Sequence, residues 1–267
     1  MQPTIPFYVI HYTRMPARRK YIETAAAASR AKQFFDFHYV EEFDREDLAV
    51  ESLYQFDESA YRRIVGPIKN ILIGYVIGLF HLKTLPFHEC VSAQARRKTT
   101  LDEDFAKWRW LRPHALKPNE VSCLRKHRAA WEQIAQSSSE WCVLAEDDII
   151  FRQNSLEYLI HLIEKAPQDA EYIDIAGGCG LVPRIGNAVV NGQFYRIDPP
   201  RDRTTCCSLL RRSFAQRLLD LDLPYCVPTD WTLTHAFTAL DTKVYWVEPV
   251  VFGHGSEMKV YESTTKP

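Results

Sequence analysis

The sequence lacks several features that would assign it to a specialised class of protein. No run of about 20 apolar residues is present, so nothing predicts a transmembrane helix. The formal net charge is only -1, which argues against a protein built mainly to coat nucleic acid. Seven cysteines are an odd number at low density and do not suggest a disulfide framework. No charged-then-apolar leader is visible, so we expect a cytoplasmic protein with free thiols.

The longest apolar stretch covers residues 71–82 and lies between Lys69 and Lys83. It is too short for a span and is more typical of a buried or interfacial helix. Basic residues follow it between Arg96 and Arg112. We therefore predict ordinary surface charge here, with peripheral contact at the inner face of the cytoplasmic membrane as the alternative.

The chain alternates between patterns typical of strands and of helices. Strands are predicted over 7–10, 34–40, 141–145, 172–176, 204–210 and 243–247, and helices over 16–33, 119–135, 156–165, 211–221 and 229–240. Residues from about 57 to 113 show no such alternation and are interpreted as a helical insertion. The prediction is a single α/β domain over residues 1–267, with a mostly parallel central sheet and helices on both faces.

The most informative stretch is an apolar run, residues 141–145, that ends in Glu146, Asp147 and Asp148. Three adjacent carboxylates repel one another and favour a compensating cation. A divalent ion such as Mg²⁺ or Mn²⁺ would also bind substrate phosphates. The alternative is an acidic helix start, in which these acids face the positive end of a following helix.

Two observations favour a metal over a helix start. Ligands of open α/β sheets bind outside the carboxyl ends of the strands, where the three acids are expected. No glycine-rich phosphate loop follows the first strand, since the chain continues as His11-Tyr12-Thr13-Arg14. A bound diphosphate would therefore depend on a metal and on basic side chains.

This combination resembles the GT-A fold of nucleotide-sugar glycosyltransferases. Four blocks in order also resemble glycosyltransferase family 25, which includes bacterial lipooligosaccharide galactosyltransferases and collagen hydroxylysine galactosyltransferases. The first block is a strand followed by an arginine-containing turn at residues 7–19, and the second is a Glu-x-x-Cys-x-x-x-His segment at 120–127. The third is the acidic segment at 144–148, and the fourth combines two late segments at 228–231 and 248–251. Asn119 and Lys126 depart from the family pattern, where Gly and Ser are usual.

The resemblance implies a set of site residues. Asp148, Asp147 and His254 are the predicted metal ligands for Mn²⁺ or Mg²⁺, while Glu146 faces the nucleotide. Arg14, Arg18, Asp147 and His127 are the further predicted donor contacts. For the arginines the alternative is solvated helix-start side chains, and for His127 a core-edge histidine.

An inverting transfer also needs a base that deprotonates the acceptor hydroxyl, and Asp230 is the candidate. The alternative is that Asp230 or Thr229 caps the helix that follows.

The predicted function is metal-dependent transfer of a hexose, with galactose favoured, from a UDP-sugar to a saccharide acceptor of a surface glycan such as lipopolysaccharide. Two other classes remain open. A metal-dependent phosphohydrolase or nucleotidyltransferase would need further acids, and only Asp174 and Asp198 are suspects. A non-catalytic sugar-binding domain would keep the fold without the chemistry.

Overall fold

The computed structural model describes residues 4–48, 117–184, 186–221 and 228–262. The predicted insertion at about 57–113, with its apolar and basic stretches, lies outside these residues. Two compact units divide the chain: Met1–Leu48, Pro118–Leu223 and Thr229–Pro267 form the first, and Ala49–Lys117 with Pro224–Pro228 form the second. Nearly all described residues belong to the first unit.

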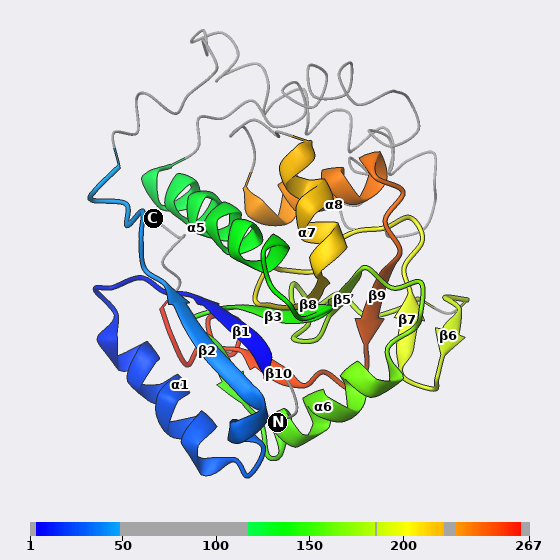
Figure 1. The fold of residues 1–267 in the computed structure, drawn as a ribbon, viewed down its shortest axis with the longest axis horizontal. Helices are drawn as coiled ribbons and strands as arrows, with labels where there is room; N and C mark the ends of the chain where they lie inside the picture. The colour runs from blue at the N-terminus through cyan, green and yellow to red at the C-terminus, as the bar shows by residue number, and fades with distance from the viewer. Residues whose placement is uncertain (1–3, 49–116, 185, 222–227, 263–267) are drawn as a thin grey trace, which may run out of the picture. The chain divides into compact units, whose positions relative to one another are not determined.

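An eight-stranded sheet with the order β2-β1-β3-β8-β5-β9-β7-β6 forms the centre of this unit (Figure 1). Its strands are β1 (Ile5–Ile10), β2 (Phe35–Val40), β3 (Trp141–Glu146), β5 (Tyr172–Asp174), β6 (Val189–Val190), β7 (Phe194–Arg196), β8 (Cys207–Arg211) and β9 (Val244–Val247). A separate two-stranded sheet pairs β4 (Ile149–Phe151) with β10 (Phe252–His254). The α/β class predicted from the sequence is confirmed.

Helices cover both faces of the sheet, as predicted. The helices are α1 (Pro16–Ala28), α5 (Pro118–Ala135), α6 (Ser155–Lys165), α7 (Arg212–Asp220) and α8 (Thr229–Ala239), with a 3₁₀ turn η1 at Lys32–Phe34. In Figure 1, α5, α7 and α8 lie on one face, and α1 and α6 lie on the other. The apolar face of α5 is buried at Leu124, His127, Trp131 and Ile134, which is the spacing expected of an amphipathic helix.

The sheet is mixed rather than mostly parallel. Strands β1, β2 and β3 run parallel, and β5 and β9 are also parallel, but β8 runs antiparallel between β3 and β5. Buried residues such as Val143, Ile173 and Leu209 fill the strands of either direction. An apolar run of this kind reveals burial but not direction, so the sequence could not predict the reversal.

The short strand β4 excludes one of the two interpretations of the acidic triplet, the acidic helix start. Asp147 and Asp148 lie in a turn, and the segment after them is the strand Ile149–Phe151. No helix begins there, so the acids do not compensate a helix dipole.

Among the described residues, no helix combines the length and apolar character that a membrane span requires.

Candidate functional site

The candidate site lies where β1, β3 and β5 end and β8 begins. Register pairs Ile10 with Glu146 across β1 and β3, and Ala145 with Cys207 across β3 and β8. The carboxyl end of β3 therefore delivers the acidic triplet to an edge that it shares with the start of β8. Three neighbouring acids acquire three different sets of partners at this edge.

Asp147 is buried and held by protein groups. Its Oδ1 accepts a hydrogen bond from Arg18 at 2.7 Å, and its Oδ2 lies 2.9 Å from His11 Nδ1 and accepts the Tyr12 backbone N–H at 3.0 Å. Arg18 is itself 6% exposed and donates to the Glu262 carbonyl at 2.6 Å. Asp147 and Arg18 therefore neutralise each other. The roles predicted from the sequence, Asp147 as metal ligand and donor contact and Arg18 as donor contact, stay predictions that this ion pair does not test.

Asp148 faces His254, as the prediction of a shared metal site requires. Asp148 Oδ2 lies 3.3 Å from His254 Nε2 and accepts a hydrogen bond from the Ser256 hydroxyl at 2.5 Å. The buried thiol of Cys206 lies 3.9 Å from Asp148 Oδ1, so a carboxylate, an imidazole and a sulfur converge, with all three ligand atoms within 4.8 Å of one another. This donor set fits a divalent metal ion.

The electrostatics of this group favour the charged forms of Asp148 and His254 but the neutral thiol of Cys206. Burial raises the pKa of Asp148, but hydrogen bonds from His254 and Ser256 outweigh burial and bring this pKa below its usual value. Burial lowers the pKa of His254, but the Asp148 carboxylate outweighs it and brings that pKa above its usual value. Burial and the Asp148 charge raise the pKa of the Cys206 thiol.

Gly255 explains how the C-terminal segment reaches Asp148. The Gly255 N–H donates to the Asp148 carbonyl at 2.8 Å. A Cβ at position 255 would lie 2.5 Å from that carbonyl oxygen, so any other residue would push the segment away. The glycine beside His254 therefore permits close approach to the chain's own backbone.

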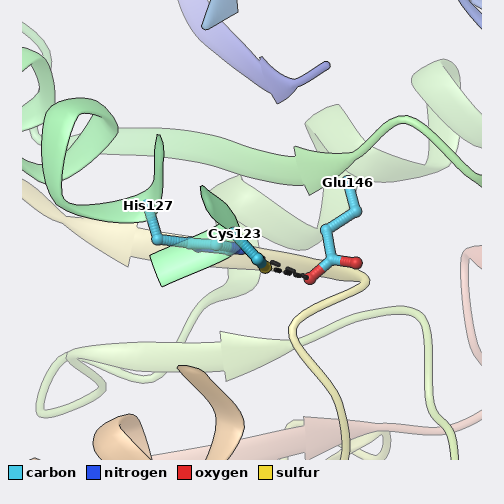
Figure 2. Close-up of side chains that lie close together, drawn as sticks. All are labelled: Cys123, His127 and Glu146. Atoms are coloured by element: carbon cyan, nitrogen blue, oxygen red, sulfur yellow. Dashed lines mark hydrogen bonds and ion pairs between the residues drawn. The ribbon is translucent and has the colours of Figure 1, made fainter. Parts of the chain in front are cut away.

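Glu146 belongs to a second group, formed with the α5 side chains Cys123 and His127 (Figure 2). Its Oε1 lies 3.3 Å from His127 Nε2 and 3.8 Å from Cys123 Sγ, and it also accepts a hydrogen bond from the Thr205 hydroxyl. The Glu146 side chain is 26% exposed, whereas that of His127 is 1% exposed. Burial, followed by the Glu146 charge, raises the pKa of the Cys123 thiol.

Asp230 lies in the first turn of α8 and is half-buried. The neighbouring Thr229 donates a hydrogen bond to Cys123 Sγ at 3.5 Å, which brings this turn beside the Glu146 group. The Asp230 charge also contributes to the raised pKa of Cys123 and of Cys179. The predicted base thus shares a region with Glu146, although it is distant in sequence.

The remaining candidates have structural partners. Arg14 is exposed, with Nε 3.8 Å from Glu46 Oε2. Asp174, a suspect for a second hydrolytic metal, is buried and paired with Arg203 at 2.8 Å. Within the described residues, neither Asp174 nor Asp198 joins a group that could hold a metal ion.

Sequence reasoning missed Cys123 and Cys206. Cys123 precedes His127 by one helical turn, a spacing that could have identified the pair. Cys206 had no such signal, because its proximity to Asp148 depends on the antiparallel pairing of β8 with β3.

Comparison with known proteins supplies the family. The crystal structures of S. aureus TarS 1–349, alone and in complex with UDP-GlcNAc, are similar at 11% and 12% identity, with TM-scores of 0.42 and 0.40. The two comparisons cover 97% and 94% of this chain, but only 62% and 58% of the respective TarS chains. No curated protein sequence matches the chain. The model of glycosyltransferase family 25, described as an LPS biosynthesis protein, matches residues 4–178. Since this match covers well over half of the sequence and agrees with the ordered blocks, the chain belongs to glycosyltransferase family 25.

Proposed function

We propose that this protein transfers a hexose, with galactose favoured, from a UDP-sugar to a saccharide acceptor of a surface glycan such as lipopolysaccharide, with inversion at the anomeric carbon. The observation that carries the proposal is the Asp148–His254 pair at the end of β3, in a chain of family 25. The acceptor class follows from the description of the family. We assign the activity to the cytoplasm, at the inner face of the cytoplasmic membrane.

Asp148 and His254 would hold Mn²⁺ or Mg²⁺, with Cys206 beside them. When bound, the ion would act as a Lewis acid toward the charge that develops on the leaving diphosphate. Asp147 and Arg18 position this site through their buried ion pair, which fixes the turn that carries Asp148. Arg14, which is exposed, remains the arginine available to donor phosphates.

Glu146 and Asp230 supply the other proposed roles. Glu146 is the acid of the triplet that retains exposure, and it would face the nucleotide with His127 behind it. Asp230 would accept the proton of the acceptor hydroxyl as that oxygen attacks the sugar. A positioned base of this kind contributes a factor of about 10² to 10⁴ to the rate.

Sugar transfer by the full chain tests the proposal. UDP-galactose and other UDP-hexoses are incubated with a lipopolysaccharide core oligosaccharide, with Mn²⁺ or with a chelator. We expect transfer that requires both metal and acceptor. Sugar release without acceptor would indicate a hydrolase, and binding without turnover would indicate a sugar-binding domain; either result contradicts the proposal.

Two variants separate the assigned roles. Asp148→Ala should lose metal-dependent binding of the donor, because the carboxylate ligand is removed. Asp230→Asn should bind donor normally but transfer about 10² to 10⁴ times more slowly. Asp241→Asn is the matched control, since Asp241 is exposed and pairs only locally with Lys243. Wild-type transfer by Asp230→Asn would exclude Asp230 as the base.

A further inference from the structure

Cys123, His127 and Glu146 bring three different metal-binding atoms together (Figure 2). Cys123 and His127 lie one turn apart on the same side of α5, and Glu146 ends β3 opposite them. We propose that these residues form a binding site for one soft divalent cation of the zinc class. The site shares no ligand with the Asp148 group. It does use Glu146 and His127, to which the proposed function gives a role at the nucleotide, so the test below measures metal binding itself and not sugar transfer.

The distances between the ligand atoms suit a tetrahedral ion. Bonds of about 2.0–2.3 Å to sulfur, nitrogen and oxygen place neighbouring ligand atoms about 3.3–3.6 Å apart. The distance from Glu146 Oε1 to His127 Nε2 is 3.3 Å, and that from Oε1 to Cys123 Sγ is 3.8 Å. All three atoms lie within 4.8 Å of one another, so an ion needs only small side-chain adjustments.

Outer hydrogen bonds orient two of the three ligands. The Thr229 hydroxyl donates to Cys123 Sγ at 3.5 Å, and the Thr205 hydroxyl donates to Glu146 Oε1. Donors of this kind stabilise a thiolate and a carboxylate in their charged, ligating forms. Binding would release the thiol proton to solvent, leaving a thiolate–metal bond and a carboxylate–metal bond that together balance the two charges of the ion.

The surroundings of His127 indicate how tightly the site would bind its metal ion. Its Nδ1 is buried and has no hydrogen-bond partner among the residues that the structure describes, whereas a ligating histidine normally donates this N–H to an acceptor. Loss of such an outer partner weakens metal binding about 10- to 100-fold. We therefore expect an exchangeable ion that a strong chelator removes without unfolding the protein.

Cobalt(II) titration of the folded full chain provides the test, because a thiolate bound to Co²⁺ gives a charge-transfer absorption band. We expect the band in the wild type, its loss in Cys123→Ser and His127→Gln, and its retention in Cys206→Ser. Zinc competition against a chromophoric chelator should give at least about a 10-fold weaker affinity for Cys123→Ser. Circular dichroism spectra identify any variant that has failed to fold.

Cys206→Ser is the decisive control, because Cys206 is the thiol of the Asp148 group. A band that disappears only in Cys206→Ser would assign the ion to the Asp148 group and overturn the proposal. A band of equal strength in the wild type and in folded Cys123→Ser would overturn it as well. If Cys123→Ser fails to fold, the folded His127→Gln variant carries the same comparison.

Discussion

At the scale of single residues, each acid of the triplet faces a different basic side chain. Glu146 faces His127, Asp147 is paired with Arg18, and Asp148 faces His254. The repulsion that first pointed to a metal is therefore compensated largely by the chain itself. A metal at Asp148 would join an existing charge balance and would not be its only source.

Arg18→Met should destabilise the protein by about 3 kcal/mol, because it leaves the buried Asp147 carboxylate without its main cation. Both side chains are 7% exposed, so solvent cannot replace the lost partner. His11 and the Tyr12 N–H remain and limit the loss. Urea denaturation followed by circular dichroism measures the change in the free energy of unfolding.

Arg14→Met is the matched control for Arg18→Met. The Arg14 side chain is 65% exposed, so its loss should change the free energy of unfolding by less than about 0.5 kcal/mol. Equal losses for the two variants would refute a specific role for the Arg18–Asp147 ion pair.

The residue scale also marks the limit of prediction from sequence. The sequence predicted a metal site shared by Asp148 and His254, and these two side chains do face each other in the structure. Arg18 was predicted to bind donor phosphates, but its partner is a carboxylate 129 positions away in the chain. No local pattern distinguishes an arginine that will be buried against an acid from one that will remain in solvent.

At the scale of elements, a single lysine joins α5 to the carboxyl end of β1. Lys126 Nζ donates to the carbonyls of His11 and Glu41 at 2.6 and 3.0 Å and lies 2.7 Å from Asp44 Oδ1. This residue departs from the serine that is usual in the family block. Its long side chain reaches three acceptors that a serine at the same position could not reach together.

Lys126→Met should lower the free energy of unfolding by about 2 to 4 kcal/mol, because it leaves the buried Asp44 carboxylate and two carbonyls without this donor. Hydrogen exchange should increase at the loop after β1, where Thr13 also depends on Asp44. Lys20→Met, at an exposed position of α1, is the control. An increase confined to α5 would contradict the proposed link to β1.

Elements were predictable in proportion to their length and burial. The run Phe7–Ile10 and the amphipathic face of α5 gave strong signals, and both elements formed where expected. Strands β4 and β10 have three residues each and depend on pairing with each other. Such strands have no periodicity of their own, so only the tertiary structure defines them.

At the scale of the whole molecule, the interior contains a second charged cluster away from the acidic triplet. Arg203 is 2% exposed and pairs with Asp174 at 2.8 Å and with Glu248 at 2.6 Å. Asp202 lies beside this cluster, where its Oδ1 accepts hydrogen bonds from the Tyr172 hydroxyl and the Arg203 backbone N–H. Its Oδ2 has no partner in the described part of the chain. Buried acids with one unpaired oxygen favour the protonated form.

Asp202→Asn should therefore stabilise the protein relative to the wild type, increasingly as pH rises above about 4. Burial, and then the charge of Asp174, raises the pKa of Asp202 well above its usual value. The unfolded chain releases this proton near pH 4, whereas the folded chain, with its raised pKa, releases it only at a higher pH, so this carboxyl makes the wild type less stable as pH rises between the two. The difference should grow by up to about 1.4 kcal/mol per pH unit until the folded protein also releases the proton.

Urea denaturation of the wild type and Asp202→Asn at several pH values measures the difference in their free energies of unfolding. For Asp241→Asn, which changes an exposed acid, this difference from the wild type should not grow with pH. Asparagine keeps the shape of the protonated acid and can still accept the Tyr172 hydrogen bond, so packing should change little. Growth in the difference would mean that the fold tolerates a neutral acid beside Asp174. A difference that stays constant would mean that Asp202 is ionised in the folded protein, and Arg203 would then be compensating three carboxylates.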